Sequence, residues 1–170
     1  EGFQYTKNAK LFAISSRSES KLMTFKNKFK IDDNYCFSNY ENLLECKDLD
    51  IIYIALPHSL HYRWVMKSIE KGKNILVEKP ATLNFSQMEN IKNNLKNKNI
   101  FFSEALMYRY HPQISKVIDL VKNKVIGNLV SMESFFGFDA LGRKKIFGIK
   151  LNKLKKKPNR NNRLYNKELG

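Results

Sequence analysis

The sequence is poor in the residues that build disulfide frameworks and metal clusters, and it has no apolar run of membrane length. Its two cysteines, Cys36 and Cys46, form no C-x-x-C pair and have no histidine nearby. We therefore expect two reduced, structural thiols, which favours a cytoplasmic protein. No apolar run reaches the roughly 20 residues that a membrane-spanning helix needs. The opening residues lack the basic and apolar regions of a signal peptide, so we expect no membrane partner.

Positive charge is abundant, but it is concentrated near one end of the sequence. The formal net charge is +15, and residues 140–167 contain eleven of the 31 lysines and arginines and no acidic residue. The first 139 residues hold 20 basic and 15 acidic side chains, a mixture typical of a solvated surface. The basic stretch has only two aromatic residues, Phe147 and Tyr165, and no pattern typical of a recognition helix. We therefore expect no nucleic-acid partner.

Short apolar runs alternate with longer amphipathic segments over the first two thirds of the sequence. Leu22, Phe25 and Phe29 recur at spacings of three and four, which predicts the apolar face of a helix with Ser18 as a candidate N-cap. An all-apolar run bounded by turn residues is typical of a parallel strand covered on both faces. The alternation predicts a doubly wound α/β sheet. The expected strands are 9–14, 34–37, 50–55, 74–77 and 100–103, and the expected helices are 18–29, 40–46, 60–71 and 85–95.

The pattern changes after Glu104, which indicates a second domain. We expect a helix at 111–122, a longer strand at 129–138 and an exposed basic loop at 141–162. The predicted domains are residues 1–108 and 109–170.

Two polar clusters follow neighbouring strands of the predicted sheet. Residues 57–61 come directly after strand 50–55, and residues 78–80 come after strand 74–77. In open parallel sheets, ligands bind just beyond the carboxyl ends of the strands, so these clusters predict a binding site. The histidine pair in the first cluster lacks a cysteine or carboxylate at ligand spacing, and we therefore expect no metal.

Four motifs together resemble one known family. Residues 55–61 read ALPHSLH, 72–73 GK, 77–80 VEKP and 104–105 EA. This series, from about Ala9 to Phe138, resembles the glucose–fructose oxidoreductase and inositol dehydrogenase family (Gfo/Idh/MocA), above all its dihydrodiol dehydrogenase-like members. The resemblance implies a Rossmann-like dinucleotide-binding domain, followed by an α+β domain whose large, mostly antiparallel sheet joins copies into a homo-oligomer. It also implies hydride transfer between a nicotinamide cofactor and a secondary alcohol or carbonyl of a sugar, cyclitol or cyclic diol.

The resemblance assigns roles to the residues at these two strand ends. It places Lys79 beside the nicotinamide and the reacting carbinol as the catalytic residue, where burial would desolvate its ammonium. Glu78 resembles the family's ribose-contacting acid, although a solvated carboxylate is an equally good interpretation. The turn beneath the cofactor comprises Leu56, Pro57, His58 and His61. For His61 a structural role stays open.

Further residues are assigned to the cofactor and the substrate. Ser15, Ser16 and Arg17 stand at the end of a strand where an acid would bind the ribose hydroxyl of NAD. Arginine accommodates the phosphate of NADP, so we expect NADP, with NAD as the alternative and a plain helix-flanking arginine also open. Met107 and Arg109 lie in the segment that resembles the family's floor of the substrate site.

The sequence departs from the family pattern at both ends. It has no G-x-G-x-x-G fingerprint, and it stops before the glycine-rich stretch with an Asp and a catalytic His or Tyr that relatives carry. We therefore interpret it as lacking the first strand and most of the second domain, and expect it to be weakly folded and inactive by itself. A non-catalytic dinucleotide-binding sensor or regulator is the alternative to an enzyme.

Overall fold

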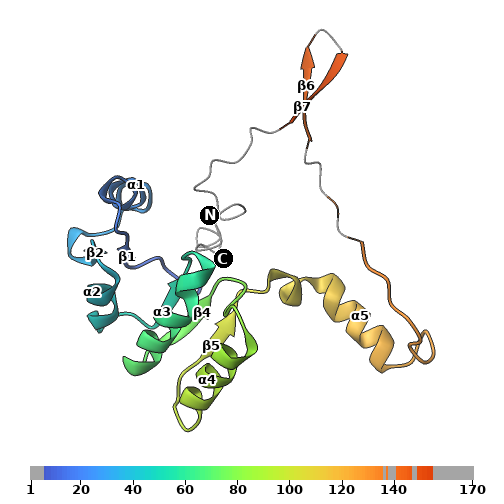
Figure 1. Cartoon of the computed structure of the whole chain (residues 1–170), viewed down its shortest axis with the longest axis horizontal. Helices are drawn as coiled ribbons and strands as arrows, with labels where there is room; N and C mark the ends of the chain where they lie inside the picture. The colour runs from blue at the N-terminus through green and yellow to red at the C-terminus, as the bar shows by residue number, and fades with distance from the viewer. Residues whose placement is uncertain (1–5, 136, 138–140, 147–148, 155–170) are drawn as a thin grey trace. The chain divides into compact units, whose positions relative to one another are not determined.

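The computed structural model describes residues 6–135, 137, 141–146 and 149–154 (Figure 1). It divides the chain into two units, Glu1–Ala105 and Leu106–Gly170. The sequence predicts the division after residue 108, three residues later than the observed division after Ala105. Among the described helices, none has the length and apolar character needed to cross a membrane.

The first unit alternates strands and helices as expected of a doubly wound fold. Helix α3 ends before Gly72, whose φ of +66° lies in the left-handed region that glycine tolerates. Residue Ser18 occupies the predicted N-cap position of α1, but its side chain makes no capping hydrogen bond. The strands are β1 (Ile14–Ser15), β2 (Cys36–Phe37), β3 (Ile51–Ile54), β4 (Asn74–Val77) and β5 (Phe102–Glu104). The helices are α1 (Glu19–Phe29), η2 (Asp33–Tyr35), α2 (Tyr40–Glu45), α3 (His58–Glu70) and α4 (Phe85–Leu95).

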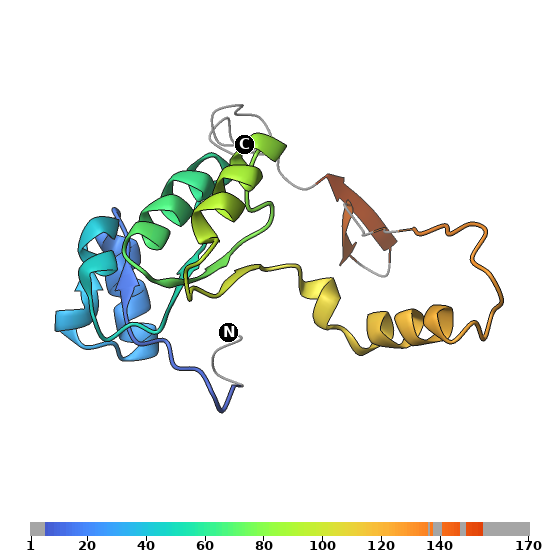
Figure 2. The same cartoon turned by 90° about the horizontal axis from the view of Figure 1, so that it is seen from below.

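Strands β3, β4 and β5 form one parallel sheet, in that order. The register pairs Ile54 with Val77 and Val77 with Glu104, so the three carboxyl ends are level. Helices α3 and α4 pack against each other beside this sheet (Figure 2). The core beneath them contains Ile52, Ile54, Val65, Ile69, Ile75, Val77 and Ile91. Each buried side chain of this size contributes about 1.5–3 kcal/mol to folding.

The opposite face of β3 is less covered than the sequence predicts. Ile51 and Tyr53 point away from the core and are 45% and 43% exposed. The expectation of burial on both faces is therefore wrong for this strand, because the helices that pack on it in the described residues cover one face. The strands β1 and β2 form a separate parallel pair beside α1 and α2 (Figure 1). Strand β1 comprises Ile14 and Ser15, so only Ile14 of the six predicted residues lies in it.

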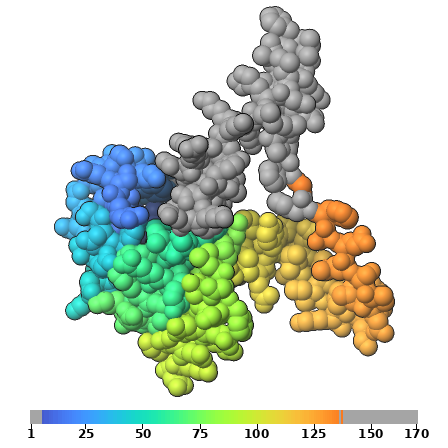
Figure 3. All heavy atoms as spheres, viewed as in Figure 1, coloured from blue at the N-terminus to red at the C-terminus, as the bar shows by residue number. Residues whose placement is uncertain are grey.

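A large apolar cavity lies between the two sheets. Its volume is about 930 Å³, and its lining includes both β1 and β3, with Leu11, Phe25 and Leu43. Within the described residues, no strand pairing joins β1 to β3. Figure 3 shows that the first unit nevertheless packs into one body, from blue through green.

The second unit differs most from expectation. It contains η3 (Met107–Tyr110), α5 (Pro112–Lys122) and an antiparallel hairpin of β6 (Leu141–Ile146) and β7 (Ile149–Leu154). The strand predicted at 129–138 is wrong for residues 129–135 and 137, which have no regular structure; residues 136 and 138 lie outside the described residues. A strand needs a paired neighbour, and apolar content alone does not supply one.

The basic loop predicted at 141–162 is wrong for residues 141–146 and 149–154, which form the hairpin. Lysine-rich sequence was interpreted as loop, but charged side chains are common on short exposed strands, where they discourage association of sheet edges. The register pairs Ile146 with Ile149, so two residues connect the strands, the commonest length for a hairpin. Residues 155–162 lie outside the described residues.

Removing a core side chain gives a direct test of this packing. Ile75 is fully buried in β4, and Ile75→Ala is expected to lower the free energy of unfolding by about 2–5 kcal/mol through lost burial and the cavity left behind. Urea unfolding of the variant measures the loss. The control Leu83→Ala removes a half-exposed leucine of the same unit and is expected to change stability by less than about 1 kcal/mol.

Candidate cofactor and catalytic site

The carboxyl ends of β3, β4 and β5 bring the two predicted polar clusters together. The ladder continues past the strands, since Glu78 N donates to Ile54 O at 2.9 Å and Ala105 N donates to Val77 O at 2.8 Å. Residues 55–57, 78–81 and 104–105 therefore meet along one edge of the sheet. This is the edge at which open parallel sheets bind ligands.

The loop after β4 carries Lys79 and is held from the neighbouring strand. Its Lys79–Pro80 peptide bond is cis. The next residue, Ala81, is buried and donates its N–H to Glu104 Oε1 on β5 at 2.8 Å. Glu104 belongs to one of the four sequence motifs, but the motif does not predict that this carboxylate holds the loop.

The Lys79 side chain itself is exposed, and in the part of the chain that the structure describes its ammonium forms no ion pair. The expected desolvation of this ammonium is therefore not provided by the described residues. The residue stands one position beyond Glu78 on a loop that Glu104 holds. Such an amine is available to a ligand.

Glu78 is fixed by a tyrosine that the sequence analysis missed. Tyr53 Oη donates to Glu78 Oε1 at 2.5 Å, and Lys79 N lies 3.3 Å from Glu78 Oε2. Burial, followed by the hydrogen bond to Glu78, raises the pKa of Tyr53 to about 12. The only signal in the sequence was a tyrosine on the face of β3 opposite the core. The bond orients the carboxylate at the end of β4.

This hydrogen bond predicts a stability change at alkaline pH. Because the pKa of Tyr53 is raised from 10.0 to about 12, its contribution is complete below pH 10 and disappears as the pH rises through 12. A two-unit shift corresponds to at most about 2.7 kcal/mol, and solvent screening at this half-exposed phenol reduces it to about 1 kcal/mol. Unfolding free energies measured across that window should fall in the parent and stay flatter in Tyr53→Phe. Equal slopes in both proteins would contradict the assignment.

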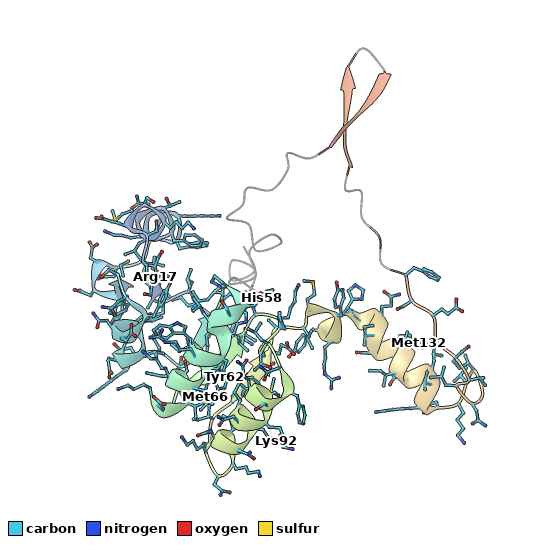
Figure 4. All side chains as sticks on the ribbon, viewed as in Figure 1. Arg17, His58, Tyr62, Met66, Lys92 and Met132 are labelled. Carbon is cyan, nitrogen blue, oxygen red and sulfur yellow. The ribbon has the colours of Figure 1, made fainter. Side chains whose placement is uncertain are left out.

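His61 lies inside the fold rather than on the surface of the site. Its side chain is fully buried, with Nδ1 2.8 Å from Pro80 O and Nε2 2.8 Å from Leu56 O. Both ring nitrogens thus face main-chain carbonyls, and neither points toward a ligand. The ring of His58 lies 5.5 Å away, at the first residue of α3 (Figure 4). The predicted cofactor contacts of Leu56, Pro57, His58 and His61 stay predictions.

The segment after β1 places a cation near an aromatic ring. Arg17 is exposed, and its guanidinium carbon lies 6.0 Å from the centroid of the Tyr40 ring (Figure 4). Ser15 Oγ donates to Asn39 O at 2.8 Å, and Ser16 Oγ accepts from Ser18 N at 3.1 Å, so both serines shape this turn. A cavity of about 180 Å³ lies here, lined by Arg17, Asn39, Tyr40, Glu41, Leu60, Arg63 and Trp64. Arg63 was not predicted, because one arginine on an amphipathic helix carries no signal of its own.

The two residues expected to contact substrate lie in the second unit. Met107 and Arg109 belong to the short helix η3, and Met107 is exposed. Their predicted role stays a prediction. Within the described residues, no group of three potential ligands for a metal ion occurs. Both cysteines are free thiols, and burial raises the pKa of the Cys36 thiol, which makes it a poor nucleophile at neutral pH.

Comparison with known proteins shows which family the sequence belongs to. The profile of the Gfo/Idh/MocA group, described as an oxidoreductase family with an NAD-binding Rossmann fold, matches residues 2–105. D-xylose 1-dehydrogenase (NADP(+)) 2 of Haloferax volcanii is 33% identical over 126 residues, which are 74% of this chain and 38% of that protein. Trans-1,2-dihydrobenzene-1,2-diol dehydrogenase of Xenopus tropicalis is 31% identical over 127 residues, 75% of this chain and 38% of that protein.

A solved structure has a similar fold over the matched part of the chain. KijD10, a 3-ketoreductase from Actinomadura kijaniata solved in complex with NADP, superimposes with a TM-score of 0.65 at 30% identity. The match covers 74% of this chain and 39% of that one. The chain thus spans about two fifths of the length of the relatives that it matches.

Proposed function

Because the chain belongs to the Gfo/Idh/MocA oxidoreductase family, with its NAD-binding Rossmann fold, we propose that it is part of an NAD(P)-dependent oxidoreductase. The proposed reaction moves hydride between the nicotinamide and a secondary alcohol or carbonyl of a sugar, cyclitol or cyclic diol. Sugar and diol dehydrogenases among the similar proteins support this substrate class. The observation that carries the proposal is Lys79, an available amine on a fixed loop at the carboxyl end of β4.

The residues present fit a phosphorylated dinucleotide. No acidic residue stands between Ile14 and Ser18, where a carboxylate would repel a ribose phosphate, and Arg17 offers a planar fork of donors suited to that phosphate. The oriented carboxylate of Glu78 can accept a hydrogen bond from a ribose hydroxyl. We therefore propose NADP, with NAD as the alternative. One similar protein has NADP(+) in its name, and a similar solved structure contains bound NADP. When bound, the nicotinamide supplies or accepts the hydride.

The chain's own contribution to the reaction centres on Lys79. As the alcohol gives up its hydride, the neutral amine of Lys79 takes up the hydroxyl proton. In the reverse direction, the ammonium returns that proton to the carbonyl oxygen. The turn at Pro57 and His58 lies at the neighbouring strand end and supports the cofactor from below. Arg109 and Met107 are proposed to contact the substrate. A bound cofactor and substrate would cover the loop and exclude water from the Lys79 amine. The described residues alone leave that side chain exposed.

The cavity between β1 and β3 suggests how the intact sheet is completed. Both strands run in the same direction as their partners, and apolar residues of both line the cavity. We propose that one further parallel strand fills this space in the whole protein and joins the two sheets. The 170 residues alone are then expected to be weakly folded and without activity.

We also propose a cellular location and an oligomeric state for the whole protein. The whole protein is proposed to be cytoplasmic, in keeping with two free thiols, and to form a homo-oligomer through the sheet of its second domain.

A substrate screen of the intact protein tests the proposed function. Aldoses, cyclitols and cyclic diols are offered with NADP⁺, and formation of reduced nicotinamide is followed by absorbance. We expect turnover with at least one class and a preference for NADP⁺ over NAD⁺. Tight binding of NADPH without turnover of any substrate would favour the sensor or regulator. Failure to bind either dinucleotide would contradict the proposal.

A further inference from the structure

His61 links the two loops that flank the proposed site. It sits on α3, one turn after Pro57, and reaches back to Leu56 O at the end of β3 and across to Pro80 O after β4. The two acceptors lie in the loops that follow β3 and β4, and Pro80 is next to Lys79.

The hydrogen-bonding capacity of the ring makes this arrangement specific. A carbonyl oxygen can only accept, whereas a neutral imidazole carries one N–H and one lone pair. In a neutral ring, one of the two 2.8 Å contacts is a donated hydrogen bond, and the tautomer decides which carbonyl accepts it. Removing the ring nitrogens would leave a buried carbonyl without its donor, at a cost of about 1–3 kcal/mol.

The loop that contains Pro80 is also held from its other side. Glu104 on β5 accepts from Ala81 N, the residue directly after Pro80. The carbonyl of Pro80 and the N–H of Ala81 belong to adjacent residues, so the main chain beyond Lys79 is fixed from α3 and from β5. Free rotation of that segment is removed, and the Cα of Lys79 is placed relative to the Pro57 turn.

We propose that His61 is a positioning residue of the reaction, whose buried ring contacts Leu56 O and Pro80 O and so fixes the loop of Lys79 to the turn beneath the cofactor. The inference rests on the proposed function, since it assigns Lys79 to the chemistry. His61 itself touches neither cofactor nor substrate. It affects turnover by placing Lys79 against the nicotinamide ring, which the Pro57 turn supports.

A double-mutant cycle in the intact protein separates positioning from general stability. His61→Phe keeps a planar ring but removes both ring nitrogens, and misplacement of a reacting group costs up to about 100-fold. We expect kcat to fall about 10- to 100-fold, with the Kd for NADPH changed less than about threefold. In a Lys79→Ala background, the same substitution should leave kcat unchanged, because the two residues act as one unit.

The control is the other buried polar residue of the same helix. Ser68 is fully buried and donates to Trp64 O, away from both loops. Ser68→Ala is expected to lower stability while leaving kcat intact. If His61→Phe does not fold, His61→Gln, which retains a donor, replaces it in the same cycle and should show a smaller loss.

Nitrogen NMR of the unsubstituted intact protein tests the buried contact without any variant. We expect a ring N–H of His61 that exchanges slowly with solvent. A ring N–H that exchanges as fast as one in water would overturn the link, and additive effects of His61→Phe and Lys79→Ala would overturn the positioning role. If Lys79→Ala alone leaves turnover unchanged, the proposed function fails first, so the two failures are distinguishable.

Discussion

Lys79→Ala in the intact protein is expected to lower kcat by about 100- to 10,000-fold, the range that positioned proton-transfer groups contribute. The reason is that the Lys79 amine takes up the hydroxyl proton when hydride leaves the alcohol, and its ammonium returns the proton in the reverse direction. The Kd for NADPH should change little, because the lysine acts on the reacting carbon's oxygen. Steady-state kinetics and equilibrium titration with NADPH separate the two quantities.

Lys92→Ala is the matched control for charge and composition. Lys92 is an exposed lysine in the last turn of α4, on the same unit (Figure 4). Its removal should leave both kcat and the Kd for NADPH unchanged. If Lys79→Ala keeps near-parental turnover, the catalytic assignment is wrong.

Arg17→Ser is expected to have the second-largest effect, on the choice of cofactor. A hydrogen bond to a charged group is worth about 1.5–3 kcal/mol, so losing the contact with the ribose phosphate should weaken NADPH binding by roughly 10- to 100-fold. NADH, which lacks this phosphate, should bind as before. Titration of both reduced cofactors against the same protein measures the ratio.

Arg63→Ser tests whether the effect is specific to Arg17. Arg63 is also exposed and lines the same small cavity, but it lies on α3 rather than at the end of β1. A change in NADPH affinity only for Arg17→Ser would support the strand-end assignment. Equal loss of NADH and NADPH binding in Arg17→Ser would show that the arginine does not recognise the phosphate.

The part of the fold governed by local pattern was predictable. The predicted bounds of β4 at 74–77 and of α4 at 85–95 agree with the structure, because each segment has its own periodicity and its own flanking turn residues. The carboxyl-end clusters also followed from the sequence, since parallel strands align those ends at one edge.

Contacts between distant segments were not predictable. The bond from Tyr53 to Glu78 depends on the register of β3 against β4, which no local pattern reveals. The two contacts of His61 likewise depend on how α3 packs over two loops. The same limit explains the error at 129–135, where apolar residues predicted a strand but its pairing depends on the rest of the fold.

The most direct test of the account is the structure of the intact protein with NADPH bound. We predict that the nicotinamide ring lies over the Pro57 turn, with its reactive carbon facing the Lys79 ammonium and the ribose phosphate beside Arg17. A cofactor bound elsewhere, or one whose nicotinamide faces away from Lys79, would contradict the assignment of this strand-end site.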